Sequence, residues 1–284
     1  MKILPIILLS FFICSCNVLT DSSEDTTQLT GKERRLPVNM VYSYDCLKSD
    51  SGSLSEILGK ADKIIGNVAT FNIEVSDKEQ VEFGEQFMKE SVKDKKFIID
   101  SASPVNAKLN IILTDLLRKR VNPTDITYKI YLLQDTATIN AYTVGGKIFI
   151  TQAMINKCTN NDQLYAIIGH EVGHNEKGHI KKAIKSMKAS KKFLGEWGDM
   201  FFAAKRILTG SFNQKNELEA DYFGLDLTWK LGYEICAIRT FWDDMAKGEE
   251  RNTILDFLRT HPHSDTRSKC LVNHIKNNFK EECK

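Results

Sequence analysis

The stretch IIGHEVGH, residues 167–174, constrains this chain more than any other part of the sequence. Two of the six histidines, His170 and His174, are four residues apart, and Glu171 directly follows the first of them. On a helix, residues at positions i and i+4 lie on the same face, so both imidazoles can bind one zinc ion. Glu171 lies a quarter-turn away, where its carboxylate can take a proton from a water that the metal has acidified. The alternative is a surface helix that carries two histidines by chance.

The residues around this motif indicate a helix. Leu164, Ile167 and Ile168 recur at helical spacing and are expected to form its buried side. The short polar residues at positions 160–162 can cap its N-terminus. His179 lies on a different face from the motif histidines and is expected to be a structural neighbour rather than a ligand. A catalytic zinc site still needs a third protein ligand and one open position, which the rest of the chain has to supply.

Residues 216–224, with the sequence NELEADYFG, offer the third ligand. Glu217 and Asp221 are four residues apart and share a helix face, and Ala220 is small enough to let another helix approach closely. We predict that Glu217 binds the metal and that Asp221 accepts the outer N–H of a ligand histidine. Glu219 lies on another side and is expected to be solvated. Without the first motif, this stretch would be an ordinary exposed acidic helix.

The segment THPHSDTR, residues 260–267, contributes two further candidates. His261 precedes a proline, which favours an extended backbone suited to a loop over a cleft. We expect His261 either to stabilise the oxyanion of the reaction or to occupy the fourth zinc position and silence the site. Arg267 is expected to pair with Asp221 or another acidic residue, or to bind a substrate carbonyl. For both residues, a purely structural loop contact is the alternative.

Two β-branched and aromatic runs precede the metal motif. They are TYKIYLL at 127–133 and KIFIT at 147–151, and they bracket NAYTVGG at 140–146, whose two glycines indicate a tight turn. Helical patterns lie before and after these runs, including a capping box at Ser76 and Glu79. Helices, a brief β-meander and then more helices predict an α+β fold that is mostly helical.

The bracketed segment is expected to be an exposed edge strand that binds substrate. An extended polypeptide can add to such an edge as a further strand, and its backbone hydrogen bonds then supply affinity with little sequence preference. An ordinary core strand is the alternative. The predicted substrate-binding residues are Asn140, Ala141, Tyr142, Thr143 and Val144.

The N-terminus predicts export and a lipid anchor. Residues 1–15 combine one lysine with an apolar run and are expected to be a lipoprotein signal peptide that ends before Cys16. Lipidation of Cys16 would attach the protein to a membrane without crossing it. A plain cleaved signal peptide is the alternative. We expect a lipidated N-terminus and flexible tether at 16–68 and a metallopeptidase domain at 69–284. Asn17 after the cysteine favours the outer membrane, with the protein facing the periplasm.

Charge and cysteine content bound the possible partners. The formal net charge of +2 argues against nucleic-acid binding. An exported chain can form disulfides, and a bridge from Cys236 to either Cys270 or Cys283 is one that the sequence allows without choosing between them. Cys46 and Cys158 complete the set, and neither the pairing nor the oligomeric state follows from the sequence.

Three ordered motifs carry a resemblance to a known family. HExxH at 170–174, ExxAD at 217–221 and His261-Pro262 with Arg267 resemble the metalloendopeptidases of the HtpX and CAAX-prenyl-protease family, metallopeptidase family 48. The segment at 139–155 is similar to the edge strand of that family. The resemblance covers roughly residues 75–275.

The resemblance implies a zincin fold of the gluzincin type. It implies one zinc ion held by His170, His174 and Glu217, with Glu171 as general base. The chain resembles the soluble, envelope-lipoprotein branch of the family, since it lacks the spanning helices of the integral members. The extra histidine of the HPH sequence leaves open whether His261 or His263 faces the site.

Two functional readings follow from these residues. The first is a zinc endopeptidase of the bacterial cell envelope that cuts unfolded or misassembled proteins. The second is a chaperone-like or binding lipoprotein that keeps the zinc fold but is latent or inactive. A purely structural zinc protein would prefer a closed set of four ligands, whereas two histidines and one glutamate predict an open site. The presence of Glu171 favours the enzyme.

Overall fold

The computed structural model describes residues 32–48, 73–95, 97–189, 212–241, 261 and 265–283. The predicted signal peptide, Cys16, most of the tether and His263 lie outside the described residues. The described elements are, in chain order, η2 (Asp45–Lys48), α2 (Asp77–Lys93), α3 (Val105–Arg118), β1 (Lys129–Leu133), β2 (Ala141–Val144), β3 (Lys147–Thr151), α4 (Gln152–Lys157), α5 (Asn161–Glu176), α6 (His179–Ala189), α8 (Gln214–Lys230), α11 (Asp265–His274) and the π-helix η5 (Ile275–Phe279). This part of the chain is mostly helical with a small sheet, as predicted.

The sheet of the described residues has the strand order β1-β3-β2, so the expected meander is wrong. β3 lies in the centre, parallel to β1 and antiparallel to β2. β2 and β3 form the expected hairpin, in which Gly145 and Gly146 have φ angles of 55° and 79°. Every residue of β3 is buried, and this strand takes the central place because its apolar residues, Ile148 to Ile150, need cover on both faces. β1 and β2 therefore lie on opposite sides of β3, and the connection from β1 to β2 crosses the position of the central strand.

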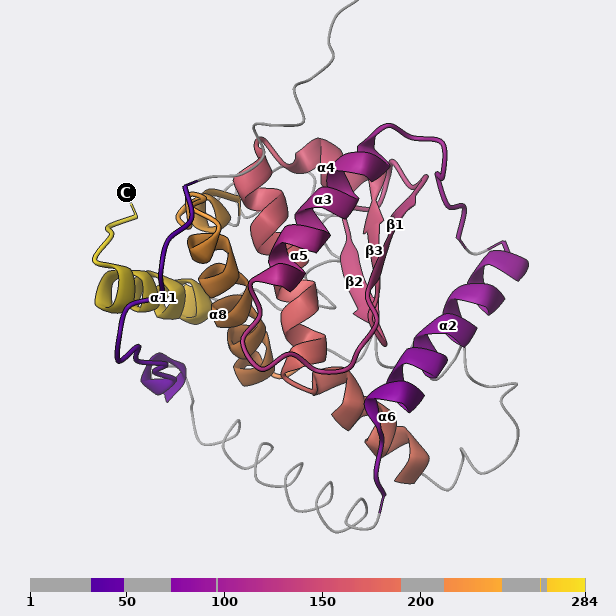
Figure 1. Ribbon diagram of the computed structural model, residues 1–284, viewed down its shortest axis with the longest axis horizontal. Coiled ribbons are helices and arrows are strands. Elements are labelled where there is room, and N and C mark those ends of the chain that lie inside the picture. The colour runs from indigo at the N-terminus through magenta and orange to yellow at the C-terminus, as the bar shows by residue number, and fades with distance from the viewer. Residues whose placement is uncertain are drawn as a thin grey trace, which may run out of the picture.

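Helices cover both faces of the sheet. Figure 1 shows α3 and α5 on one side of the strands and α2 on the other. Alternate strand residues face the two sides: Ile148 and Ile150 pack with α3 and α5, whereas Phe149 packs against Phe87 of α2. The helix α2 begins at the predicted capping box, in which Ser76 and Glu79 each accept from the other's backbone N–H.

The helices α5 and α8 cross with almost no space between their backbones. A Cβ atom at Gly224 would lie 2.6 Å from the backbone N of His170, and one at Gly169 would lie 2.9 Å from the Cα of Gly224. Ala220 is fully buried at this crossing, as the sequence predicted. The consequence is that α8 delivers its acidic residues directly onto the histidine-bearing face of α5.

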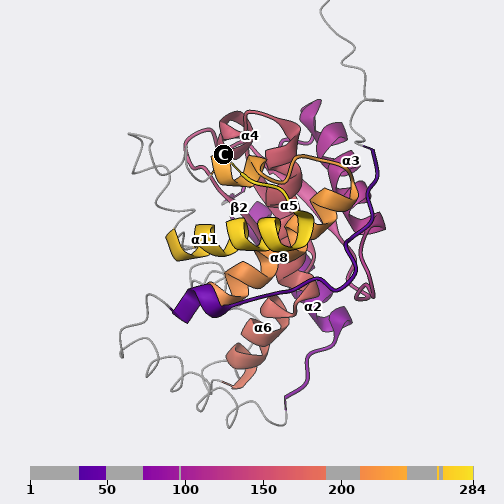
Figure 2. The same cartoon turned by 90° about the vertical axis from the view of Figure 1, so that its left-hand side faces the viewer.

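The segment 32–48 packs along α8 and α11, beside the C-terminus (Figure 2). Two disulfides lie in the described residues: Cys46 pairs with Cys270 and Cys236 with Cys283. Of the two partners expected for Cys236, the structure selects Cys283, because Cys270 is taken by the N-terminal segment. Cys158 is a free thiol. The Cys46–Cys270 bridge fixes this segment to α11, which also carries Arg267.

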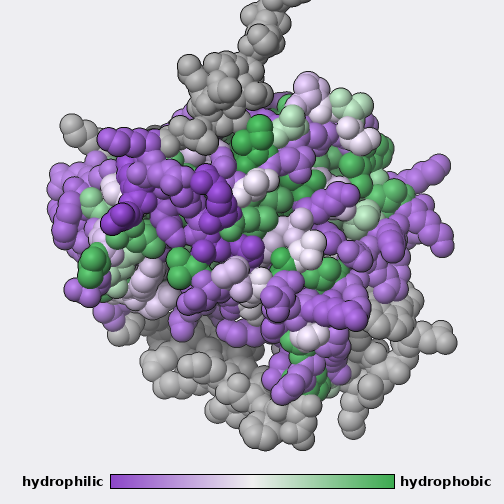
Figure 3. Space-filling model, in the orientation of Figure 1, coloured by the Kyte–Doolittle hydropathy of each residue, from purple (hydrophilic) through white to green (hydrophobic). Residues whose placement is uncertain are grey.

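Hydrophilic residues cover most of the face in Figure 3, and the apolar residues gather in patches between them. None of the helices in the described residues is long and apolar enough to cross a membrane.

Candidate active site

The two motif histidines project from the C-terminal half of α5. The N-cap of this helix is Asn160, whose side chain accepts a hydrogen bond from the backbone N–H of Gln163. The sequence predicted one buried side, but α5 is buried on every side from Gln163 to Asn175 because α3, α8 and the sheet surround it. The Nε2 atoms of His170 and His174 lie 2.9 Å apart. The spacing of four residues has therefore placed both rings at one point.

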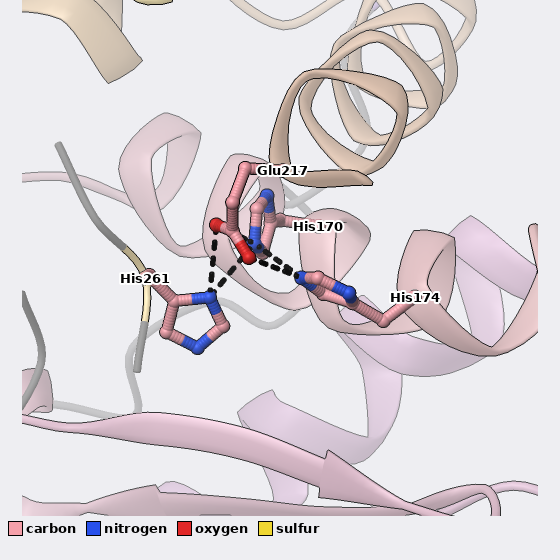
Figure 4. Close-up of side chains that lie close together, drawn as sticks. All are labelled: His170, His174, Glu217 and His261. Carbon is pink, nitrogen blue, oxygen red and sulfur yellow. Dashed lines mark hydrogen bonds and ion pairs between the residues drawn. The ribbon is translucent and has the colours of Figure 1, made fainter. Parts of the chain in front are cut away.

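Glu217 of α8 faces this pair. Its carboxylate lies 3.5 Å from Nε2 of His170 and 3.4 Å from Nε2 of His174, and its side chain is fully buried. His261 completes the group, with Nδ1 3.2 Å from both Nε2 of His170 and Oε2 of Glu217. Figure 4 shows the Glu217 carboxylate in the middle of the three imidazole rings. One donor atom from each of the four residues lies within 4.8 Å of the others.

Asp221 and Arg267 lie behind the donor cluster of His170, His174, Glu217 and His261. The Oδ1 atom of Asp221 accepts from Nδ1 of His170 at 2.8 Å, which is the contact the sequence predicted. Arg267, only 1% exposed, donates Nε–H to Asp221 at 2.6 Å and lies 3.0 Å from Glu217. Burial acts to raise the pKa of Asp221, but Arg267 and His170 hold it down, at about 2. Of the expected roles for Arg267, the structure shows the pairing with Asp221.

Glu171 is buried beside the cluster. Neither of its carboxylate oxygens has a hydrogen-bond partner within the described part of the chain, although Oε1 lies 3.5 Å from Nε2 of His261. Burial raises the pKa of Glu171, and the charges of His261 and His170 oppose that rise only in part. A buried carboxylate without a partner has a strong tendency to take up a proton. These are the properties that a general base requires.

The pKa values of the two motif histidines move in opposite directions. Burial acts to lower the pKa of His170, but the carboxylates of Asp221 and Glu217 outweigh it and raise the value to about 10. Burial holds the pKa of His174 well below its ordinary value. Burial acts to raise the pKa of Glu217, yet His261 and the other cationic neighbours hold it well below its ordinary range.

The predicted substrate strand lies at an edge of the sheet and close to the donor cluster. It comprises Asn140 and the strand β2. All four residues of β2 are buried, so the expectation of an exposed strand is wrong although the strand is at the edge of the described sheet. The carbonyl of Asn140 accepts from the backbone N–H of Thr151 in the hairpin. Antiparallel pairing alternates, so the backbone groups of Ala141 and Thr143 face the outer edge. The carbonyl of Ala141 indeed lies 3.2 Å from Nε2 of His261.

Two further residues lie beside the site, and His179 is a neighbour of His174 rather than one of the four donors, as expected. Nδ1 of His179 lies 3.1 Å from Nδ1 of His174, and Nε2 of His179 lies 2.9 Å from Oε2 of Glu219. Glu219, which was expected to be solvated, keeps only 21% of its side chain exposed. The chain turns back after α5, which puts His179 against His174 although the two are on different faces by helical spacing. Gly178 is the sequence signal for this turn, and in the structure it has a φ angle of 71°.

The donor set fits a cation such as zinc. His170 donates its Nδ1–H to a carboxylate, which leaves Nε2 free to bind through its lone pair. Its Nε2 meets two further imidazole nitrogens, and Oε1 of Glu217 has no hydrogen-bond partner among the described residues. A shared cation satisfies all of these atoms at once, and imidazole nitrogen with carboxylate oxygen is a preferred zinc environment.

The chain is similar in sequence to a known protein family and to several known proteins. The model of peptidase family M48 matches residues 104–275, more than half of the chain. Metalloprotease LoiP of Escherichia coli is 28% identical over 196 residues, covering 62% of this chain and 73% of LoiP. The mitochondrial metalloendopeptidase OMA1 of Schizosaccharomyces pombe is 29% identical over 159 residues, covering 50% and 45%. The β-barrel assembly-enhancing protease of Escherichia coli is 27% identical over 159 residues, covering 48% and 32%.

The chain thus spans most of the length of LoiP but less than half of the other two relatives. The matched residues contain the whole donor cluster, Glu171, Asp221 and Arg267. The family match, together with relatives that are named as metalloproteases and metalloendopeptidases, decides the kind of protein. The chain belongs to peptidase family M48 and is a metalloendopeptidase.

Proposed function

We propose that the chain is a zinc-dependent endopeptidase of the bacterial cell envelope that hydrolyses unfolded or misassembled proteins. The observation that carries this proposal is the cluster of four donor residues with the unpartnered Glu171 carboxylate beside it. The helical architecture and the crossing of α5 with α8 support a zincin fold of the gluzincin type. The proposed domain is 69–284, preceded by a signal peptide at 1–15 and a lipidated tether at 16–68.

His170, His174 and Glu217 would hold one zinc ion per chain. The ion would supply Lewis acidity, both for the attacking water and for the carbonyl of the scissile peptide bond. Asp221 orients His170 through the 2.8 Å hydrogen bond to Nδ1. Arg267 is a positioning residue in this account, because it is buried and holds Asp221 and Glu217 rather than facing an open space.

Glu171 would act as the general base and then as the general acid. Its carboxylate takes a proton from the attacking water and passes it to the nitrogen of the leaving amine. The raised pKa of Glu171, caused first by burial, favours this exchange because the proton is held long enough to be delivered. Neither carboxylate oxygen of Glu171 makes a hydrogen bond in the described part of the chain, so its proton-transfer role stays separate from the donor set.

Extended polypeptides are the proposed substrates. A peptide would add to the outer edge of β2 and use the backbone groups of Ala141 and Thr143, with Asn140, Tyr142 and Val144 shaping the strand. Recognition through the backbone suits unfolded segments, since any extended sequence offers the same groups. One relative is named as a β-barrel assembly-enhancing protease, and we propose β-barrel assembly as a setting in which this chain also acts.

The position of His261 favours a resting state in which this residue blocks the metal site until substrate displaces it. Its Nδ1 lies beside the donor atoms of the other three cluster residues and can take the fourth position at the metal, and its Nε2 contacts the Ala141 carbonyl. An incoming strand would compete for that carbonyl and displace His261. We therefore expect His261→Ala to raise the rate of casein cleavage by the purified protein. A large fall in rate would instead assign His261 to oxyanion stabilisation.

Cleavage and metal content together test the proposed ligand set. Glu217→Ala removes a carboxylate that contacts both motif histidines, so zinc stoichiometry and casein cleavage should both fall sharply. Lys215→Ala, on the same helix but with 61% of its side chain exposed, is the matched control and should retain both. Unchanged zinc in Glu217→Ala would contradict the assignment.

The envelope location rests on the N-terminal sequence and has its own test. Growth with a labelled fatty acid should label the wild-type protein and leave Cys16→Ala unlabelled. The variant should also leave the membrane fraction. Equal labelling of both proteins would contradict lipidation at Cys16.

A further inference from the structure

His179 occupies a place that the proposed mechanism does not use. It is the first residue of α6, and Gly178 before it, with a φ angle of 71°, lets the chain turn back sharply after α5. The side chain of His179 has no exposed surface. The turn brings its ring edge-on to the ring of His174, with the centroids 5.1 Å apart. His179 therefore contacts a predicted zinc ligand from the side that faces away from the donor cluster.

The contacts define the proton positions on both rings. Nε2 of His174 faces Glu217 and His170, so it must carry a lone pair if His174 binds a metal. The N–H of neutral His174 is then on Nδ1, which lies 3.1 Å from Nδ1 of His179. Nδ1 of His179 must accept this hydrogen, so the N–H of His179 is on Nε2 and is donated to Glu219 at 2.9 Å. One consistent set of tautomers satisfies every contact.

We propose that His179 and Glu219 form a relay that fixes the tautomer and orientation of His174. The proposal rests on the proposed function in one respect, that His174 binds zinc. Glu219 accepts a hydrogen bond from Nε2–H of His179, so Nδ1 of His179 carries a lone pair and is an acceptor. This acceptor holds the N–H of His174 on Nδ1, the nitrogen away from the metal. A partner of this kind orients a ligand imidazole and makes it a better electron-pair donor to the metal. His179 is a positioning residue and not a ligand, since both of its ring nitrogens are engaged.

The surroundings of His174 make His179, rather than a water molecule, the hydrogen-bond partner of its Nδ1 atom. The ring of Phe212 lies 4.2 Å from the ring of His174 and covers it, and the His174 side chain has no exposed surface. Water therefore has no direct access to Nδ1 of His174. Glu219 lies on α8, two residues from Glu217, so one helix supplies both the carboxylate that faces the metal side of His174 and the one that acts through His179.

Three variants separate positioning from packing. His179→Leu removes the acceptor. His179→Asn keeps an acceptor oxygen near the position of Nδ1, although it loses the link to Glu219. Glu219→Ala removes the far end of the relay from a partly exposed site and leaves the buried rings in place. Lys215→Ala is the control, because Lys215 contacts Glu219 at 3.6 Å without being part of the relay.

The measurement is zinc affinity of the purified full chain by competition with a chelator, alongside the melting temperature in excess chelator. We expect His179→Leu to weaken zinc binding by about 10- to 100-fold. His179→Asn should recover most of that loss, and Glu219→Ala should weaken binding several-fold with an unchanged melting temperature of the metal-free protein. Lys215→Ala should bind zinc as the wild type does.

Two results would overturn the relay. One is wild-type zinc affinity in His179→Leu. The other is equal weakening in His179→Leu and His179→Asn that follows a fall in the metal-free melting temperature, because this pattern describes packing alone. If His179→Leu does not fold, Glu219→Ala decides, and wild-type affinity in that variant would also overturn the relay. Failure of the proposed function is distinguishable, since the wild-type protein would then bind no zinc.

Discussion

His170 and His174 are one helical turn apart in the same motif, yet their surroundings differ. The outer nitrogen of His170 meets the carboxylate of Asp221 directly, and Arg267 stands behind that carboxylate. The outer nitrogen of His174 meets another imidazole, and the carboxylate comes only after it. The pKa of His170 accordingly rises to about 10, whereas burial keeps the pKa of His174 well below its ordinary value.

The difference teaches that the motif alone does not set the chemistry of its histidines. The spacing within α5 brings the two inner nitrogens together. The outer partners come from α8, α11 and the start of α6, which are set by the fold. The His170 end is a fully buried ion pair, and the His174 end is a chain of two buried imidazoles that ends at the partly exposed carboxylate of Glu219. Changes at the two ends should therefore differ in their effects on stability and on metal binding.

The largest effect is expected from Asp221→Asn. This change leaves Arg267 without its closest carboxylate in a fully buried place, and breaking one side of a buried ion pair costs about 3–5 kcal/mol of unfolding free energy. It also replaces the charged acceptor of His170 with a neutral amide oxygen, so zinc affinity should fall by about 10- to 100-fold. Denaturant unfolding and chelator competition measure the two quantities. A stability loss no greater than that of Glu219→Ala would break the comparison.

The protonation states of the metal-free protein give the next test. With a pKa of about 10, His170 should carry two ring protons at pH 8, whereas the lowered pKa of His174 should keep that ring neutral at pH 6.5, where an ordinary imidazole is half protonated. The raised pKa of His170 contributes stability that is present below about pH 6.5 and is lost as the pH rises through about 10. His174 acts in the opposite sense, and its contribution is lost as the pH falls below about 6.5. Imidazole NMR resonances report both states, and equal titration of the two rings near pH 6.5 would contradict this account.

A smaller effect is expected at the helix crossing. A Cβ at Gly224 would meet the backbone of His170 at 2.6 Å, while a Cβ at Gly173 would meet the oxygen of Ala220 at 2.9 Å. Gly224→Ala should destabilise the protein by about 1–3 kcal/mol, since backbone rather than a flexible side chain has to move. Gly173→Ala should cost less. Thermal unfolding of the two variants compares them, and the reverse order would mean that the crossing is tightest at the His174 end.

The smallest effect is expected from Lys215→Ala. The Lys215–Glu219 pair is separated by 3.6 Å and its lysine is largely exposed, so the loss of unfolding free energy should stay below about 0.5 kcal/mol. A larger loss would mean that Glu219 depends on this lysine for its position beside His179. Denaturant unfolding of the variant beside the wild type measures it.

Local patterns predicted the elements and the central group of the site. The motif spacing, the capping box at Ser76 and the glycine turn at 145–146 are each decided within a few residues, and each was correct. The spacing of Glu217 and Asp221 also predicted that both would face α5, because residues at positions i and i+4 lie on the same face of α8 and therefore point toward the same neighbouring helix.

Features that depend on distant partners were not predicted. The parallel pairing of β1 with β3 depends on which strand needs cover on both faces, and a hairpin signal says nothing about that choice. The Cys46–Cys270 bridge joins residues that are 224 positions apart. His179 enters the site through one turn after α5, which helical periodicity cannot represent. Residues that act through the loops between elements are for this reason the hardest to find from sequence.

Casein cleavage by the wild type and Glu171→Gln, with bound zinc quantified in both, tests the central claim most directly. The substitution keeps the size of the side chain and removes the base but no metal ligand. The account predicts one zinc per chain in both proteins and a rate of cleavage lower by about 10²- to 10⁴-fold in the variant. Undiminished cleavage by Glu171→Gln, or loss of its zinc, would contradict the assignment of Glu171 as the general base of a zinc endopeptidase.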